Sequence, residues 1–150
     1  ALAGDLDIAR VTATSAGDPA QSASLDLTTT ANAVYGVGLL PGTLDTTGLP
    51  GTVVEYDLLI TNQGNASDSF DLVISGESWD TAVNATVGPL AAGASTTISV
   101  SVTIPALAAN GSTDNAILTA NSQADGSQSV TSSLTTTARF YLLFAPIVVQ

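Results

Sequence analysis

The sequence predicts an all-β fold, a sandwich of antiparallel sheets, and three observations support this prediction. Apolar and polar residues alternate with a period of two along several segments, turn signals rich in Gly and Pro separate these segments, and no long stretch keeps a helical period. The chain has 150 residues, which is enough for one domain with a substantial core. Short strands at this spacing are typical of two packed sheets.

The alternation is clearest in two segments. Every second side chain from Val54 to Ile60 is apolar, and the same holds from Ile98 to Ile104. This pattern indicates antiparallel strands with one face in a core. Along the chain we expect strands at residues 7–15, 22–29, 33–40, 52–62, 67–75, 79–87, 95–104, 114–122 and 128–137. The turn signals LPGT, GLPG, NQGNAS, AAGA, AANGS and ADGS lie between them.

A long-range repeat links the two ends of the chain. The five residues LTTTA occur at Leu27–Ala31 and again at Leu134–Ala138, an offset of 107 positions. Extended backwards without a gap, the match also includes Asp7, Ala9, Thr12, Ala13, Ser15, Asp18, Gln21 and Ser22. A period of this length corresponds to one sandwich-sized domain. We therefore expect a partial repeat, a hairpin, at 1–31, a complete sandwich at 32–138 and a hydrophobic strand at 139–150.

A second set of spaced residues runs through the central unit: Pro50-Gly51, Val54, Tyr56, Leu58, Thr61-Asn62, Gly64-Asn65, Asp68, Phe70-Asp71-Leu72, Trp79, Leu90, Gly93, Thr119-Ala120 and Ser122-Gln123. This pattern resembles the immunoglobulin-like accessory repeats of bacterial and archaeal surface proteins, the type found beside sugar-binding modules in alpha-galactosidases. The resemblance implies an immunoglobulin-like antiparallel β-sandwich. It implies little chemistry, because members of the family are mostly spacers, stalks and shell or fibre modules.

The composition excludes several classes of function. The net charge is −11, and Arg10 and Arg139 are the only basic residues, so there is no cationic patch for nucleic acid or anionic lipid. Without His, Lys or Cys, a Ser or Thr nucleophile has no ordinary base and a transition metal has no soft ligand. No apolar run is long enough for a spanning helix. We expect no enzyme activity, no cofactor, no metal and no membrane insertion.

Oxygen ligands occur in four pairs: Glu55 with Asp57, Glu77 with Asp80, Asp5 with Asp7, and Asn65 with Asp68. Two carboxylates can carry out glycoside hydrolysis, but acids on one face of an exposed strand are usually a solvated surface. Oxygen ligands alone can build a calcium site, yet no pair belongs to a complete loop pattern. Surface and turn-capping roles are therefore favoured.

Aromatic residues and glycosylation triplets are two further candidates. Trp79, Tyr56 and Phe70 could form a platform for sugars, but the inward strand positions of Tyr56 and Phe70 favour packing in the core. Three Asn-x-Ser/Thr triplets are candidate glycan acceptors, and they begin at Asn65, Asn84 and Asn110.

The C-terminal segment RFYLLFAPIVVQ is almost continuously apolar. Both faces of such a strand should be covered, because a strand with one wet face would alternate. At the offset of 107, Phe140–Ile147 takes the place of Ala33–Leu40, the first strand of a following domain. The candidate subunit interface is therefore Phe140, Tyr141, Leu142, Leu143, Phe144, Ile147, Val148 and Val149.

Three roles are open for this segment. It could fold back as the last strand of its own sandwich, it could enter a groove of a neighbouring copy by strand donation, or it could serve a membrane or sorting role. Strand donation repeated head to tail produces a filament. Pro146 marks a bend or an edge position in each case.

We expect a secreted structural subunit that self-assembles noncovalently, head to tail, into an extracellular filament or surface layer. The absence of an initiator Met indicates processing, and removal of a signal peptide before Ala1 is the simplest route to the cell surface. The expected contact joins the C-terminal segment to a region near Asp7–Thr30 of another copy. The alternative is a monomeric spacer or carbohydrate-binding accessory module of a cell-surface protein. Because each copy carries a charge of −11, assembly should strengthen with salt or mild acid.

Overall fold

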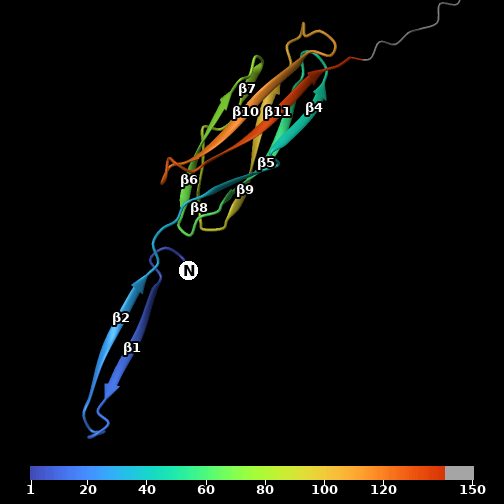
Figure 1. Cartoon of the computed structure of the whole chain (residues 1–150). Helices are drawn as coiled ribbons and strands as arrows, with labels where there is room; N and C mark the ends of the chain where they lie inside the picture. The colour runs from blue at the N-terminus through green and yellow to red at the C-terminus, as the bar shows by residue number, and fades with distance from the viewer. Residues whose placement is uncertain (141–150) are drawn as a thin grey trace, which may run out of the picture.

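The computed structural model describes residues 1–140, and all regular structure in this part of the chain is β. Eleven strands form a two-stranded hairpin, a five-stranded sheet and a four-stranded sheet. The two larger sheets pack as a sandwich, and the hairpin projects from one end of it (Figure 1). The prediction of an all-β sandwich with an extra N-terminal hairpin is confirmed.

The hairpin consists of β1 (Leu6–Thr14) and β2 (Ser22–Thr30). The two strands are antiparallel, with Leu6 opposite Thr30 at the base and Thr14 opposite Ser22 near the turn. Every residue of both strands is exposed. Within residues 1–140, therefore, nothing packs on either face of the hairpin.

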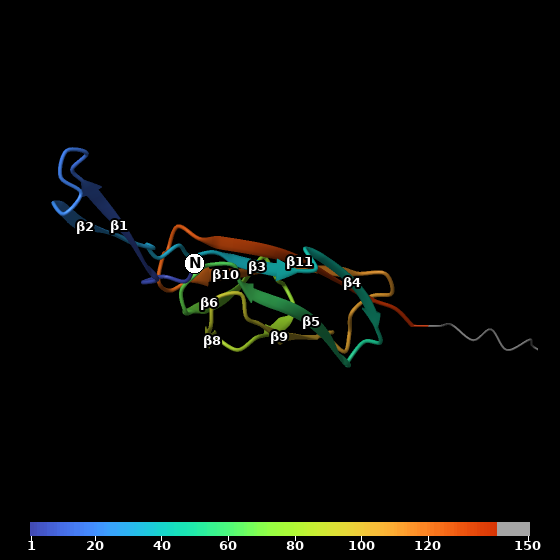
Figure 2. The same ribbon diagram turned by 90° about the horizontal axis from the view of Figure 1, so that it is seen from below.

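The larger sheet has the strand order β4 (Thr43–Gly48), β11 (Ser129–Ala138), β10 (Thr113–Ser122), β6 (Asp68–Ser75) and β8 (Thr86–Leu90). Its pairings are antiparallel except that β4 runs parallel to β11. The smaller sheet has the order β3 (Val37–Leu40), β5 (Val53–Asn62), β9 (Ser95–Thr103) and β7 (Asp80–Ala82), all antiparallel. This division of strands is immunoglobulin-like, and the two layers are visible in Figure 2.

The core lies between the two sheets. Tyr56, Leu58 and Ile60 of β5 point inward and are at most 2% exposed, while Glu55, Asp57 and Leu59, which alternate with them, are exposed. The same alternation holds in β9. Phe70, Leu118 and Leu134 from the opposite sheet are fully buried against them. The period-two patterns of these strands were therefore predicted correctly, because each of them has one wet and one dry face.

Three of the strand predictions are wrong, and the first is that of residues 33–40, where β3 begins only at Val37. The segment 43–48 was expected to be loop but forms β4, an edge strand on which Leu44 is the one large apolar side chain. The predicted strand 79–87 is divided into β7 and β8, which lie in different sheets. Short edge strands have few buried positions, so their alternation is too brief to recognise in sequence.

Candidate functional site

The N-terminal hairpin is a backbone copy of the β10–β11 hairpin. Leu6 pairs with Thr30, and Thr113, which lies 107 positions after Leu6, pairs with Thr137, which lies 107 positions after Thr30. The same shift relates all the paired positions of β1 and β2 to those of β10 and β11. The sequence repeat is therefore also a repeat of strand register.

The turns of the two hairpins are copies as well. The Asp18 N–H donates to the hydroxyl of Ser15 at 3.2 Å, and the Asp125 N–H donates to the hydroxyl of Ser122 at 3.0 Å. Each Asp carboxylate also accepts the N–H two residues further on, at 3.1 Å and 3.0 Å. Such Asx turns fix the geometry of a loop locally. The N-terminal turn therefore forms without support from a surrounding sandwich.

At the base, the two hairpins close with the same backbone conformation. The Gly4 N–H donates to the carbonyl of Ala31 at 2.9 Å, and the Gly111 N–H donates to that of Ala138 at 2.7 Å. Both glycines have a positive φ, 85° and 87°, which a residue with a Cβ rarely adopts. The structural copy thus extends over 4–31 and 111–138.

The two copies differ in what covers them. Ala116, Leu118, Ala120 and Leu134 are at most 1% exposed in the sandwich. Their counterparts Ala9, Val11, Ala13 and Leu27 are all exposed, and half of the Val11 and Leu27 side chains is accessible to solvent. The sequence repeat could have predicted this apolar face, because each of its four residues lies 107 positions before a core residue of the sandwich. The face of the N-terminal hairpin that would belong to a core is bare within residues 1–140.

The two hairpins also differ in the burial of an equivalent carboxylate, that of Asp114 and Asp7. Asp114 is 3% exposed, and its Oδ1 accepts the N–H groups of Ser78 at 2.6 Å and Trp79 at 3.3 Å. Asp7, the counterpart of Asp114, is exposed on the hairpin. Asp114 thus ties the loop before β7 to the opposite sheet, and Asp7 makes no such bond among the described residues.

A buried hydroxyl pair shows the same contrast. The Tyr56 hydroxyl donates to the carbonyl of Thr135 at 2.7 Å and lies 2.7 Å from the hydroxyl of Thr136. Burial raises the pKa of the Tyr56 phenol, and the bond to Thr136 opposes this shift. Thr29, the counterpart of Thr136, is exposed. The N-terminal hairpin therefore keeps both the apolar and the polar core positions of its copy without their partners.

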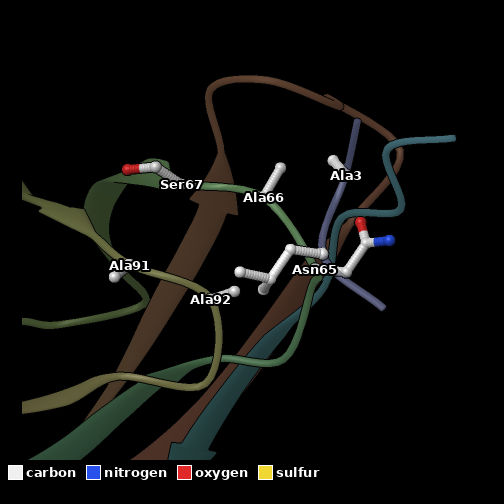
Figure 3. A pocket seen from close by; sticks show the side chains of 7 residues that line it. Ala3, Asn65, Ala66, Ser67, Ala91 and Ala92 are labelled. Carbon is white, nitrogen blue, oxygen red and sulfur yellow. The ribbon is translucent and has the colours of Figure 1, made fainter. Parts of the chain in front are cut away.

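Asn65, in the loop between β5 and β6, joins the hairpin to the sandwich (Figure 3). Its side-chain Oδ1 accepts the Val34 N–H at 2.7 Å, and its Nδ2 donates to the carbonyls of Asn32 at 3.0 Å and Ala1 at 3.5 Å. Its backbone carbonyl accepts the Ala3 N–H, and its own N–H donates to Val34 O, both at 2.9 Å. Asn65 thus holds the incoming and outgoing segments of the hairpin together.

A groove of about 370 Å³ lies beside this junction. It is lined by Leu2, Ala3, Asn65, Ala66, Ser67, Ala91 and Ala92, most of which Figure 3 labels. The lining is small and mostly apolar, with no charged side chain. The groove therefore offers contact area but no chemistry for catalysis.

Replacing Asn65 with Ala is expected to loosen the hairpin while changing the free energy of unfolding by only about 1 kcal/mol, because partly exposed hydrogen bonds contribute little and the two main-chain bonds remain. Spin labels on cysteines introduced at Gly17, near the tip, and at Thr97, on the outer face of β9, would report the distance distribution. We expect the distribution to broaden for Asn65→Ala but not for the exposed control Asn84→Ala. An unchanged distribution would contradict the role of Asn65 as the junction.

The three glycosylation triplets lie in different settings. The amide nitrogen of Asn65 is used by the junction. Asn84 and Asn110 are exposed in loops, and Asn110 Oδ1 accepts the Phe140 N–H at 3.2 Å. The amide nitrogens of Asn84 and Asn110 are therefore more accessible to a glycan than that of Asn65.

The acidic pairs form no site in the structure. Glu55 accepts the hydroxyl of Ser99 at 2.9 Å, and Glu55, Asp57, Glu77 and Asp80 are exposed. The buried Asp68 carboxylate accepts hydrogen bonds from Ser69, Ser122 and Ala124, so its oxygens are occupied. Among residues 1–140, no group of three potential metal-ligating side chains comes together.

Tyr56, Phe70 and Trp79 do not form an exposed platform. Tyr56 and Phe70 are in the core, as their strand positions indicated, and Trp79 is half-buried against it. The packing interpretation is confirmed for Tyr56 and Phe70. The geometry therefore gives no support to a sugar-stacking surface built from these three rings.

Only Phe140 of the predicted interface lies in the described part of the chain. It is 39% exposed, and the residue before it, Arg139, donates its N–H to Gly48 O at 2.8 Å. Tyr141, Leu142, Leu143, Phe144, Ile147, Val148 and Val149 lie outside the described residues. The expectation for these seven side chains stays a prediction.

The two packed sheets and the separate β1–β2 hairpin place the chain in the class of all-β, immunoglobulin-like sandwiches. Solved structures with some likeness include a PapD-like domain of human CEP192, at 12% identity and a TM-score of 0.48, covering 68% of this chain and 84% of that one. Another is the secreted serine protease VesC from Vibrio cholerae, at 22% identity and a TM-score of 0.49, covering 69% of this chain. A third is a family 123 glycoside hydrolase from Clostridium perfringens, at 9% identity and a TM-score of 0.48, covering 71% of this chain.

These likenesses bear on neither function nor partners, since each TM-score is below 0.5 and each identity is below 25%. The chain spans only 23% and 27% of the lengths of the two enzymes. No family model matches the chain, and no curated protein matches its sequence. In the described residues there is also no helix of the length and apolarity that crossing a membrane requires.

Proposed function

We propose that the chain is a secreted structural subunit that assembles noncovalently, head to tail, into an extracellular filament or surface layer. In this proposal the C-terminal segment 139–150 is the donated strand and a neighbouring copy is the acceptor. The role needs no catalysis, cofactor or metal. It agrees with the resemblance to surface-protein repeats, many of which are fibre or shell modules.

The observation that carries this proposal is the placement of the two ends. The hairpin leaves the sandwich beside Asn65, whereas β11 ends beside Gly48 at the opposite end (Figures 1 and 2). A contact between opposite ends of successive copies uses two different surfaces. Such a contact is heterologous, and when it does not close into a ring it produces a filament.

The sandwich does not need the C-terminal segment to complete its core. Phe70, Leu58, Ile60, Leu118 and Leu134 are at most 1% exposed, and the strands that surround them all lie within residues 1–140. Large apolar side chains remain exposed on the outside of the sandwich, among them Leu40 and Leu59, which lie opposite each other on β3 and β5. A role as the last strand of its own sandwich therefore receives no support from an open core.

The segment is also too short to cover the hairpin of its own chain. The ten residues 141–150 span at most roughly 36 Å when fully extended, and β11 alone is roughly 33 Å long. Running back along the sandwich would therefore use the whole segment before it reached the middle of β1 and β2. A second copy is the better acceptor for the donated strand.

The energies allow assembly. Burying the eight large apolar side chains of the segment would contribute roughly 1.5–3 kcal/mol each, against an association cost of about 4–15 kcal/mol. The charge of −11 on each copy opposes contact, and salt reduces this repulsion because the Debye length falls to about 10 Å at 0.1 M. Assembly should therefore be stronger at moderate than at low salt. Glycans, where attached, would be carried by Asn84 and Asn110.

The test compares the full chain with a variant that ends at Ala138, at equal concentrations and in a series of salt concentrations. We expect the full chain to sediment as large species and to form filaments in electron micrographs. The shorter variant should remain a folded monomer at every salt concentration, because it keeps all the strands of the sandwich.

Two results would count against the proposal. If the full chain is monomeric throughout, the self-assembling role is wrong, and the alternative of a monomeric spacer or accessory module takes its place. If the shorter variant assembles equally well, the C-terminal segment is not the donor.

A further inference from the structure

We propose that the acceptor of the donated strand is one face of the β1–β2 hairpin of a second copy, and that the strand lies across this face as β3 lies across β10 and β11. The acceptor face consists of Ala9, Val11, Ala13, Ala23, Leu25 and Leu27. This inference rests on the proposed function and adds the site and the direction of the contact. In the resulting contact between two copies, which we call the joint, a single strand of one copy packs as a second layer on the hairpin of the other.

The two faces of the hairpin differ in character. On the acceptor face the opposed pairs are Ala9 with Leu27, Val11 with Leu25, and Ala13 with Ala23. On the other face Arg10 lies 3.5 Å from Asp26, and the hydroxyls of Thr12 and Ser24 are 3.0 Å apart. Leu6 and Ile8 add apolar surface to that second face only near the base. The acceptor face is thus the apolar one along most of the hairpin.

The sandwich itself shows what covers such a face. The counterparts of the acceptor residues lie on the inner face of β10–β11, and β3 packs against both strands from the opposite sheet. Val37 and Leu39 of β3 are 9% and 4% exposed in the shared core. At the offset of 107, Phe144 takes the place of Val37. The segment that occupies the sequence position of β3 is therefore the expected cover of the bare hairpin.

One difference in sequence between the β10–β11 hairpin and the β1–β2 hairpin favours an apolar donated strand. Ser132 of β11 is 1% exposed and donates its hydroxyl to the carbonyl of Pro41 at 2.8 Å. The hairpin has Leu25 in place of Ser132, and this side chain is 66% exposed. In the C-terminal segment the place of Pro41 is taken by Val148. The polar contact between Ser132 and Pro41 in the sandwich is thus replaced by an apolar contact between Leu25 and Val148 in the proposed interface.

The positions also give the direction of the donated strand. In the sandwich β3 begins at the end where the β10–β11 turn lies, since Val37 pairs with Asn62 and the Gln123 N–H donates to Ser69 O. Transferred to the joint, Phe144 would lie toward the hairpin turn and Val148 beside Leu25. Successive copies then follow one another with the same polarity, as the proposed filament requires.

The experiment uses full-length chains with one surface blocked at a time. Leu25→Asp places a charge on the acceptor face, and its matched control Ser24→Asp places the same charge on the opposite face of the same strand. Phe144→Asp blocks the donor. The hairpin lies outside the sandwich core. When the two hairpin changes are made in the variant that ends at Ala138, so that assembly does not add to the measured stability, we therefore expect an unchanged Trp79 fluorescence and melting transition for both.

We expect Leu25→Asp to weaken assembly at least 100-fold, measured as the protein concentration needed for half-maximal sedimentation, and Ser24→Asp to change it by less than threefold. Phe144→Asp alone should also fail to assemble. A mixture of Leu25→Asp and Phe144→Asp should form a one-to-one dimer, because each variant supplies the surface that the other lacks.

The outcomes separate this inference from the function on which it rests. If unmodified chains assemble and Leu25→Asp assembles equally well, the acceptor face is wrong while the structural role stands. The same conclusion follows if the two blocked variants fail to pair. If unmodified chains do not assemble under any condition, the proposed function is wrong, and the inference about the acceptor face is then wrong as well.

Discussion

Replacing Leu134 with Ala is expected to lower the free energy of unfolding by about 2–5 kcal/mol. Leu134 lies in the middle of β11, is fully buried, and packs in the core shared by both sheets. The substitution removes apolar contact and leaves a cavity, because the strands on both sides are held by their neighbours. Chemical denaturation followed by Trp79 fluorescence would measure the loss.

The repeat supplies a closely matched control. Leu27 is the counterpart of Leu134, in the same register of the same hairpin type, but it is 50% exposed. We expect Leu27→Ala to change the free energy of unfolding by less than about 0.5 kcal/mol. Both changes should be made in the variant that ends at Ala138, so that assembly does not add to the measured stability. Equal losses at the two positions would contradict the assignment of core and bare surface.

Replacing Asn62 with Ala is expected to cost about 3 kcal/mol or more. The Asn62 side chain is fully buried; its Nδ2 donates to the carbonyls of Ala66 at 2.8 Å and Leu90 at 2.9 Å, and its Oδ1 accepts the Gly64 N–H at 2.9 Å. Truncation removes the side-chain partner of the Ala66 carbonyl and the Gly64 N–H, while the Leu90 carbonyl keeps a bond from the Ser67 hydroxyl at 3.3 Å. Each unsatisfied buried group costs about 1–3 kcal/mol. Denaturation midpoints would show the effect.

Two further variants test this explanation. Asn62→Asp keeps an acceptor for Gly64 but loses both donors and adds a buried charge, so it should be at least as destabilising as Ala. Asn84→Ala, the same truncation at an exposed loop position, should change stability by less than about 0.5 kcal/mol. A small loss at Asn62 would mean that water replaces the side chain at this site.

The sequence predicted the central strands well and the edges poorly. In β5 and β9, long alternation with one buried face follows directly from the packing of two sheets, so both strands were located within one or two residues. β4 was not predicted, because its pairing with β11 depends on backbone hydrogen bonds and Leu44 alone contributes a large apolar side chain. Nor could alternation show that the chain changes sheets between β7 and β8.

The candidate site was predictable in outline only. The offset of 107 located the N-terminal hairpin and its copy, and strand parity within the repeat could have identified Val11 and Leu27 as core-type positions. The role of Asn65 could not be predicted in the same way. It depends on three side-chain bonds to segments far away in sequence, and a TNQGN turn gives no sign of such partners.

The chain also contains two hairpins with the backbone register that the sandwich uses at β10–β11. Either hairpin could dock beside β6 as the sandwich closes, and the side chains decide between them. If β1–β2 took the place of β10–β11, Leu25 would meet the carbonyl of Pro41 without the hydroxyl that Ser132 provides, and Val11 would leave part of the Leu118 site empty. The two hairpins are therefore alike enough to share one backbone and different enough that the sandwich selects the correct one.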